Sequence, residues 1–379
     1  MENFVAMNPT ALHFGKGVIS DLGATTKIYG QKVLLVYGKG SVVKNGIYAT
    51  VVDQLKGAGA TVFEYSGIKS NPIIDDVDAA AKLGRDNNVD VIVAVGGGSV
   101  IDSAKFISLA IPIQNKAWDI LEYKVKPRVA VPLIAVLTLA ATGTEMNGFA
   151  VVQNNETKQK PGYYSPFIYP RHSFLDPAYT ISVPADYTAF GIVDLIAHCL
   201  EGYFGKGEAP LSDLFAVAIM SEAMVCGPRL MKALDNYDLR ARIMYAATNA
   251  LNGLIMYGKP GGDWGTHGLG HTLSVLYDVP HGASLSIAFP AWMKLYSESD
   301  SEKVAVLGLS LFGTQTAEEA IAGFERFFRS LNSPVRLSDI NIGKDKRQEF
   351  INNLSVNKVT GGNLKLTEVE YGRLFDLML

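Results

Sequence analysis

Four of the six histidines in the chain lie between positions 198 and 281, close to one aspartate. Asp194 and His198 are four residues apart in a run without glycine or proline between them, and His267 and His271 have the same spacing. Residues four apart share one face of a helix. His281 follows ten residues after His271. One carboxylate with several imidazoles suits a divalent transition metal such as Zn(II) or Fe(II), and does not suit Ca or Mg.

A single histidine among apolar residues is more often packed in a core than bound to a metal. Two pairs at helical spacing, together with an aspartate, are hard to produce by packing alone. A structural zinc site is the main alternative, but such sites are usually rich in cysteine. Neither Cys199 nor Cys226 belongs to a C-x-x-C pair. We therefore predict a metal site that carries out chemistry.

Composition is that of a globular protein with a large core. The chain has 379 residues, which is long enough for two domains, and is 48% hydrophobic and 19% charged. Its net charge of −3 gives no basic footprint for nucleic acid. Two cysteines, and an N-terminus without a signal-peptide pattern, predict a reducing, cytoplasmic location. No run of about 18 apolar residues predicts a membrane span.

The first half of the chain alternates short apolar runs with amphipathic stretches. Strands are expected at residues 31–37, 60–67, 89–95 and 129–138, and helices at 48–56, 73–87 and 100–110. This alternation predicts a parallel sheet with helices on both faces, which binds ligands outside the carboxyl ends of its strands.

The character of the sequence changes after residue 150. Residues 150–183 predict a hairpin and a return strand at 172–175, and helical spacing dominates from residue 184. We predict an α/β domain with a mainly parallel sheet over residues 1–185 and an all-α domain over residues 186–379. The part after Ser301 contains no motif that indicates a role.

Two glycine-containing loops suggest a nucleotide site. Gly97, Gly98 and Ser99 stand between a predicted strand and a predicted helix, where backbone N–H groups can approach a phosphate. The pattern is neither G-x-G-x-x-G nor a P-loop. A second loop, LAATGTEMN, follows the strand at 129–138 and offers threonines that can bind phosphate or an amide, or simply form turns: Thr138, Thr142 and Thr144.

Taken together, these residues resemble the iron-containing (group III) alcohol dehydrogenases. The likeness is carried by GGGSVIDSAK, TGTEMN, the Asp194/His198 pair and the run H-G-L-G-H-x9-H. It is greatest to the butanol dehydrogenase branch, which includes NADPH-dependent aldehyde reductases. The resemblance implies an α/β dinucleotide-binding domain followed by a helical metal-binding domain, and a homodimer.

The resemblance also implies site residues, position by position. The implied metal ligands are Asp194, His198, His267 and His281, with His271 beside the metal, near substrate and nicotinamide. Gly97, Gly98 and Ser99 match the pyrophosphate loop, and Asp102 matches the acid behind it, close to the nicotinamide. Further implied cofactor contacts are Asn71, Thr138, Thr142, Asn147 and Lys160.

The turn after the first predicted strand bears on the choice of cofactor. NAD-preferring relatives often carry an aspartate there, which holds the ribose hydroxyls of the adenosine. Here the turn contains Gly38, Lys39 and Ser41 and no carboxylate. Lys39 and Ser41 suit a 2′-phosphate, although Lys39 also fits a solvated loop lysine. We predict NADP(H) in preference to NAD(H).

The predicted reaction is hydride transfer between the nicotinamide and a small aliphatic aldehyde or primary alcohol, at Fe(II) or Zn(II), with His271 carrying a proton. Candidate apolar pocket walls are Phe149, Tyr257, Trp264 and Leu269. A glycerol dehydrogenase-type polyol dehydrogenase is the nearest alternative. A dehydroquinate synthase-like lyase is disfavoured because basic residues near the ligands are few, with Lys206 and Lys259 nearest. A non-catalytic nucleotide sensor with a structural metal is the remaining alternative.

Overall fold

The computed structural model describes residues 1–379, which form two compact units. The α/β unit contains residues 7–183 and 235–244, and the helical unit contains residues 1–6, 184–234 and 245–379. Each unit thus includes a short segment from the other side of residue 185. The predicted division into two domains at that residue stays a prediction.

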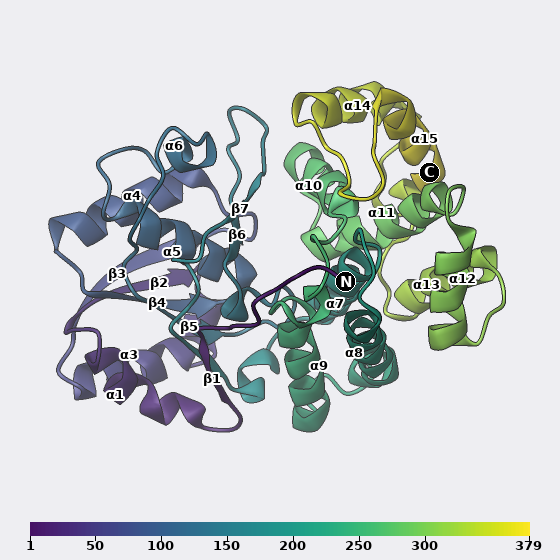
Figure 1. Ribbon diagram of the computed structural model, residues 1–379. Helices are drawn as coiled ribbons and strands as arrows, with labels where there is room; N and C mark the ends of the chain where they lie inside the picture. The colour runs from purple at the N-terminus through teal and green to yellow at the C-terminus, as the bar shows by residue number, and fades with distance from the viewer. The chain divides into compact units, whose positions relative to one another are not determined.

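The α/β unit is built on a six-stranded sheet with the strand order β1-β8-β5-β4-β2-β3 (Figure 1). All neighbouring strands are parallel, which confirms the predicted sheet. Its strands are β1 (Ala11–Phe14), β2 (Lys32–Gly38), β3 (Thr61–Ile68), β4 (Val91–Gly96), β5 (Leu133–Leu137) and β8 (His172–Leu175). Strand β1 is a short, partly exposed edge strand that was not predicted from the sequence.

Helices cover both faces of this sheet, because successive strand residues point to opposite sides. Leu34 and Val36 of β2 enter a core with α4 (Ile74–Asp86) and α5 (Gly98–Ala110). Val33 and Leu35 enter the opposite core with α3 (Ile47–Gly57). Figure 1 shows α1 and α3 on one side and α4 and α5 on the other. The remaining elements of this unit are α1 (Leu22–Lys27), α2 (Ser41–Lys44), α6 (Trp118–Leu121) and the predicted antiparallel hairpin of β6 (Phe149–Val151) and β7 (Gly162–Tyr164).

The strand order brings three loops to one edge of the sheet. Strand β3 lies on one side of β2, and the next strand, β4, lies on the other side. The strand order therefore reverses between β2 and β4. Ligands of open α/β sheets bind outside the carboxyl ends of the strands at such a reversal. The turn after β2, the glycine turn after β4 and the loop after β5 all begin at that edge.

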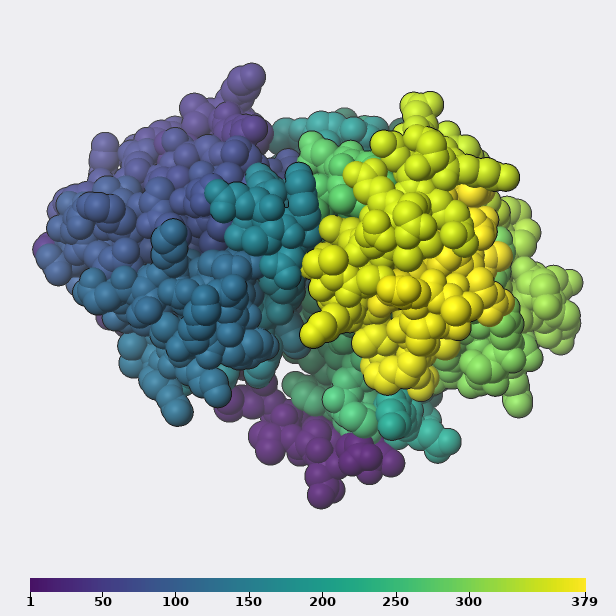
Figure 2. Space-filling view, turned by 90° about the horizontal axis from the view of Figure 1, so that it is seen from above, coloured from purple at the N-terminus to yellow at the C-terminus, as the bar shows by residue number.

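Two largely buried helices, α7 (Ala185–Tyr203) and α11 (His281–Tyr296), form the centre of the helical unit. The two helices pack against each other. Around them lie α8 (Pro210–Leu230), α10 (Gly265–Tyr277), α12 (Ser301–Phe312), α13 (Ala317–Ser330), α14 (Arg347–Val356) and α15 (Glu368–Met378), while α9 (Tyr237–Ala250) has residues in both units. The first residues of the chain join this unit: the N–H of Glu2 donates to the carbonyl of Gly258 at 2.8 Å. In Figure 2 the purple N-terminal segment lies against green and teal residues.

By length and apolar composition, α8 alone would be able to cross a membrane. Its mean hydropathy is 1.4 over an 18-residue window, of which 33% is buried. The helix packs against α7 and contains Asp213, Glu222 and Arg229. One such helix is weak evidence for a membrane span, because the core helices of globular proteins have the same composition.

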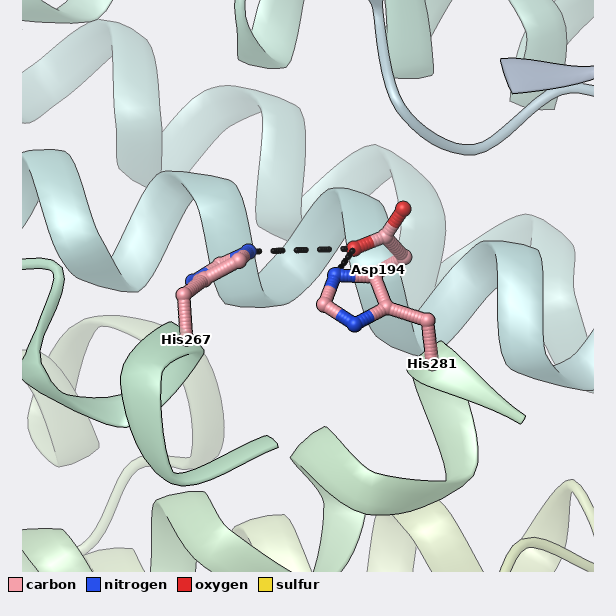
Figure 3. Close-up of side chains that lie close together, drawn as sticks. All are labelled: Asp194, His267 and His281. Carbon is pink, nitrogen blue, oxygen red and sulfur yellow. Dashed lines mark ion pairs between the residues drawn. The ribbon is translucent and has the colours of Figure 1, made fainter. Parts of the chain in front are cut away.

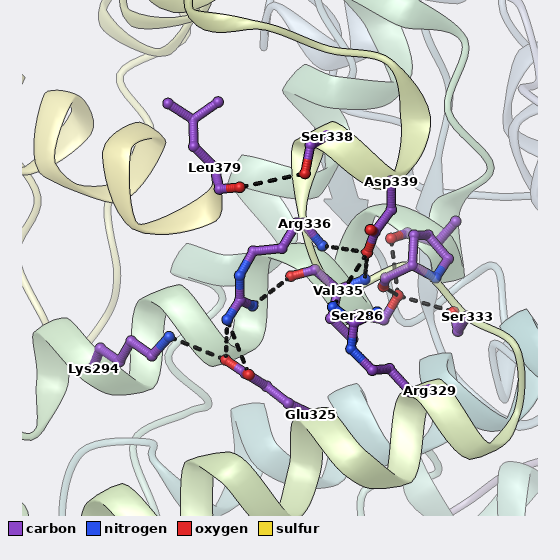
Figure 4. Close-up of polar contacts among 12 residues, drawn as sticks. Ser286, Lys294, Glu325, Arg329, Ser333, Val335, Arg336, Ser338, Asp339 and Leu379 are labelled. Atoms are coloured by element: carbon purple, nitrogen blue, oxygen red, sulfur yellow. Dashed lines mark hydrogen bonds and ion pairs between the residues drawn. The ribbon is translucent and has the colours of Figure 1, made fainter.

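A polar network fixes α11 to the C-terminal third of the chain (Figure 4). Glu325 of α13 accepts a hydrogen bond from Lys294 of α11 at 3.0 Å, and both its carboxylate oxygens lie 2.9 Å from the donor Nη2 of Arg336. Asp339 accepts from the N–H groups of Val335 and Arg336. This network holds in place the helix that begins with His281.

Candidate metal centre

Helix α7 supplies the first two candidate ligands. Its sequence contains no proline after Pro184, which precedes the first turn, and nearly every side chain is buried. Such a helix lies in the core of its domain. Asp194 and His198 are 2% and 4% exposed, on the shared face that their spacing predicts. Two polar side chains are thus held inside an apolar core.

Helices α10 and α11 supply the other candidate ligands and are joined by only residues 278–280. His267 lies in the first turn of α10, and His281 is the first residue of α11, directly after Pro280. The residues that flank α10, Trp264 and Asp278, have φ values of 66° and 53°. Non-glycine residues in this left-handed region carry strain, which tends to collect at functional sites.

The four predicted ligands converge around one carboxylate oxygen. Asp194 Oδ1 lies 3.7 Å from His198 Nε2, 3.9 Å from His267 Nε2 and 3.5 Å from His281 Nε2. The ligand atoms of Asp194, His267 and His281 all lie within 4.8 Å of one another (Figure 3). Metal–ligand bonds of about 2.1 Å in a tetrahedron separate neighbouring ligand atoms by about 3.4 Å. The three distances from Asp194 to the histidines, 3.5 to 3.9 Å, are close to that value.

The donor atoms fit a divalent ion chemically as well. His267 Nε2 is buried and makes no hydrogen bond, which a bound metal would explain. Burial lowers the pKa of His267 to about 3, and burial with the neighbouring His267 lowers the pKa of His198 well below its ordinary value. Both rings are therefore neutral, as metal ligands must be. The two rings stack, with centroids 4.9 Å apart.

Glu201 is a functional candidate that the sequence analysis missed. It lies on α7, seven residues after Asp194, and is 1% exposed. Its Oε1 is 2.7 Å from His267 Nδ1 and accepts from the His267 N–H at 3.0 Å, while Oε2 accepts from the Trp264 N–H. Burial raises the pKa of Glu201 to about 8, and the two backbone donors oppose that rise. The i, i+7 spacing on the ligand-bearing face was the available signal.

The residues predicted to surround the metal are separated by the structure into three groups. The His271 ring lies 5.2 Å from that of His281 and 6.4 Å from that of His267. The Trp264 ring lies 5.3 Å from that of His267. These two side chains border the centre. Leu269 is fully buried, and Tyr257 stacks on Phe4 at 5.2 Å, so both pack within the helical unit. Phe149 lies in β6 of the α/β unit and is 40% exposed.

In the α/β unit, the predicted phosphate loop is tightly packed. Gly97 and Gly98 open α5 directly after β4. A Cβ on Gly98 would lie 2.6 Å from a methyl carbon of Thr142, so the loops after β4 and β5 touch where glycine is required. Ser99 donates its hydroxyl to the carbonyl of Ser70, next to Asn71. Thr138 follows β5 directly, and its N–H donates to the carbonyl of Gly96.

The other predicted cofactor residues of this unit fall into two clusters. Lys160 donates to Asn71 at 2.9 Å. Asp102 accepts from the Thr144 hydroxyl at 2.6 Å and from the Val151 N–H at 2.9 Å. The side-chain amide of Asn147 donates to the carbonyl of Gly143, and its Oδ1 accepts from the Phe149 N–H and from Lys105, which favours a framework role for this residue. Gly38, Lys39 and Ser41 form the partly open turn between β2 and α2.

Lys105 connects these loops and was not predicted from the sequence. Its ammonium group is fully buried and donates to Thr144 Oγ1 at 2.6 Å, to the carbonyls of Asn147 and Phe149 at 2.8 and 2.6 Å, and to Asn147 Oδ1 at 3.1 Å. Burial lowers the pKa of Lys105 to about 7, although the negative charges of Asp102 and Glu145 act to raise it.

Comparison with known proteins assigns the chain to a family. Residues 9–177 match the iron-containing alcohol dehydrogenase model, and residues 188–370 match the model of the C-terminal part of the Fe-containing alcohol dehydrogenase family. The probable NADH-dependent butanol dehydrogenase 1 of Bacillus subtilis is 39% identical over 370 residues, 95% of each chain. The NADPH-dependent aldehyde reductase YqhD of Escherichia coli is 38% identical over 349 residues, 89% of each chain. The crystal structure of NADH-dependent butanol dehydrogenase A from Thermotoga maritima has a TM-score of 0.97 and 37% identity, and the match covers 100% of this chain and 99% of that one. The chain therefore belongs to the iron-containing alcohol dehydrogenase family.

Proposed function

We propose that the protein transfers hydride between a nicotinamide cofactor and a small aliphatic aldehyde or its primary alcohol, at a metal held by Asp194, His198, His267 and His281. One observation carries this proposal: Asp194 Oδ1 lies between 3.5 and 3.9 Å from the Nε2 atoms of all three histidines. The named activities of the relatives, butanol dehydrogenase and aldehyde reductase, support the substrate class.

The side chains around the site have distinct proposed roles. A divalent ion, Fe(II) or Zn(II), would supply a Lewis acid for the substrate oxygen. The buried carboxylate and neutral imidazoles hold such an ion without cancelling its charge. His271 is the proposed proton carrier, because its ring borders that of His281, with centroids 5.2 Å apart. Trp264 forms an apolar wall beside His267.

We propose NADPH as the preferred cofactor, bound by Lys39 and Ser41 at its 2′-phosphate. Lys39 and Ser41 are exposed and follow β2, in a turn whose own residues include no carboxylate. The carboxylate of Glu64, on neighbouring β3, accepts from the hydroxyls of Tyr37 and Tyr48. Among the relatives, the two butanol dehydrogenases of Clostridium acetobutylicum are named NADH-dependent and YqhD is named NADPH-dependent. A ratio of kcat/KM values for the two cofactors tests the proposal. Lys39→Asp should move the ratio toward NADH. Equal kcat/KM values for NADPH and NADH in the unmodified protein would contradict the proposed preference.

A phosphorylated or polyanionic substrate has little support. Of the two lysines nearest in sequence to the ligands, Lys259 is buried and donates to the carbonyls of Gly202 and Tyr203 and to Asp213. It therefore holds the end of α7. Lys206 is exposed and lies in a backbone bridge with Gly261. This disfavours the lyase alternative.

We also propose a cytoplasmic homodimer, as the resemblance implies. Light scattering at several protein concentrations measures the mass directly. About 82 kDa, twice the chain mass of 40.9 kDa, is expected, and a mass of a single chain at micromolar concentration would contradict it.

The activity is tested with butyraldehyde and NADPH as substrates of the purified protein. Oxidation of NADPH should require aldehyde, stop after chelation and return on addition of Fe(II) or Zn(II). His271→Ala should lower turnover and leave the metal content unchanged. If that variant lost the metal, His271 would be a ligand, and activity that persisted in fully chelated protein would refute the metal-dependent reaction.

A further inference from the structure

The buried carboxylate of Glu201 has no role in the reaction proposed above. Its three hydrogen-bond donors all come from the start of α10: the N–H of Trp264, the N–H of His267 and Nδ1 of His267. No lysine or arginine forms an ion pair with it; its side-chain partner is the neutral His267 ring, with Nδ1 2.7 Å away. A carboxylate buried to 1% exposure is costly to retain. Its contacts point to a function at His267.

The hydrogen bond decides which nitrogen of His267 carries the proton. Both oxygens of Glu201 accept a backbone N–H, Oε2 from Trp264 and Oε1 from His267, and such donors favour the ionised carboxylate. An ionised oxygen only accepts, so the contact of Oε1 with Nδ1 at 2.7 Å places the ring proton on Nδ1. The Nε2 lone pair is then free, and it is this atom that faces Asp194 Oδ1 at 3.9 Å. The neutral tautomer with a free Nε2 is the form that binds a metal.

The same contacts also fix the ring in space. Glu201 binds both the backbone and the side chain of His267, so the imidazole has little freedom to rotate. Because Asp194, His198 and Glu201 stand at i, i+4 and i+7 of one helix, α7 provides two candidate ligands directly and aims a third.

We propose that Glu201 is a positioning residue of the metal centre, which holds His267 in the tautomer and orientation that present Nε2 to a divalent cation. The inference rests on the metal site proposed above. Glu201 acts through the imidazole of His267 and is not itself one of the proposed ligands.

A purely structural role for Glu201, that of joining α7 to α10, makes a different prediction. In that case, replacing Glu201 would lower the stability of the protein without a specific effect on the His267 tautomer or on metal affinity. Glu201→Gln keeps the size and one acceptor oxygen, but loses the charge and replaces the other acceptor with a donor. Glu208→Gln removes the same charge from an exposed position of the same unit and is the matched control.

The first measurement is made on the unmodified protein, with one variant used only to assign the signals. In ¹⁵N-labelled, metal-free protein, long-range ¹H–¹⁵N spectra report the tautomer of each histidine, and the His267 signals are assigned from their absence in His267→Gln. The proposal predicts that Nδ1 carries the proton in the unmodified protein. A His267 ring protonated on Nε2 would overturn it, whatever the stability of any Glu201 variant.

The second measurement is the dissociation constant for Zn(II), by competition with a chromophoric chelator. Glu201→Gln should weaken zinc binding by roughly 10–100-fold and mix the His267 tautomers, while Glu208→Gln binds as the unmodified protein does. Equal affinity of Glu201→Gln and the unmodified protein would refute the positioning role. If neither the unmodified protein nor Asp194→Asn binds zinc measurably, the metal site itself fails, which is a distinguishable result.

Discussion

Gly282 lets helices α7 and α11 approach closely enough for Asp194 and His281 to meet. It is the second residue of α11, next to His281, and a Cβ built on it would lie 2.1 Å from the carbonyl oxygen of Phe190. Phe190 is one turn before Asp194 on α7. Ordinary van der Waals contact begins at 3.4 Å, so alanine would force the two backbones apart by up to 3.4 − 2.1 = 1.3 Å.

A displacement of about 1 Å matters because metal–ligand distances tolerate only about 0.2 Å. Loss of an outer-shell partner typically weakens metal binding by roughly 10–100-fold. Gly282→Ala should weaken Zn(II) binding by at least as much, because it displaces a ligand itself. Overpacking should also lower the free energy of unfolding of the metal-free protein by roughly 1–3 kcal/mol. Competition with a chelator measures the affinity, and urea unfolding measures the stability.

The matched control for this change is Gly227→Ala. Gly227 is also a buried glycine inside a helix, α8, but the nearest atom to its added Cβ is 3.4 Å away. The control should leave zinc affinity unchanged and unfolding within about 1 kcal/mol of the unmodified protein. Wild-type zinc affinity in Gly282→Ala would refute the argument that this close approach sets the geometry of the site.

Three further predictions concern buried ionisable groups. Burial first, and the charge of Glu201 second, raise the pKa of Asp263 to about 6, above the ordinary value of 3.8. The folded state then binds more protons than the unfolded state at pH values between 3.8 and 6. As the pH falls from 7 to 5, the free energy of unfolding of the metal-free protein should therefore rise by roughly 1 kcal/mol relative to that of Asp263→Asn. Urea unfolding midpoints that change equally with pH in the two proteins would contradict this. Lys105→Met removes the donor to the carbonyls of Asn147 and Phe149 and the positive charge near Asp102, and should destabilise the protein by about 3–5 kcal/mol. A loss below 1 kcal/mol in urea unfolding would show that the cluster is not stabilising. Burial strongly raises the pKa of Cys199, so this thiol should react with a disulfide reagent only after unfolding, and rapid labelling of the native protein, mapped by peptide mass, would contradict its burial.

Periodicity in the sequence was sufficient to predict most of the strands and helices of the α/β unit. The runs at β2 and β4 are buried on both faces, and such strands read as continuous apolar segments. Strand β5 proved shorter than predicted, because the expected range of 129–138 included residues before Leu133 that lie outside the sheet. The four residues of β1 are partly exposed and carry no apolar run, so they gave no signal.

The spacing of the histidines predicted the ligand face of α7 because helical geometry is local. The convergence of α7, α10 and α11 depends on close approaches such as the one at Gly282, and periodicity does not reveal these. Glu201 and Lys105 were missed for one reason. Charged residues are usually exposed, and only the three-dimensional structure shows these two to be buried among polar partners.

The central claim is that Asp194 and three histidines hold one divalent ion. Elemental analysis of the purified protein and of Asp194→Ala, prepared side by side under anaerobic conditions, tests it most directly. We predict about one equivalent of iron or zinc per chain in the unmodified protein and almost none in a folded Asp194→Ala. Equal metal content in the two proteins would contradict the assignment.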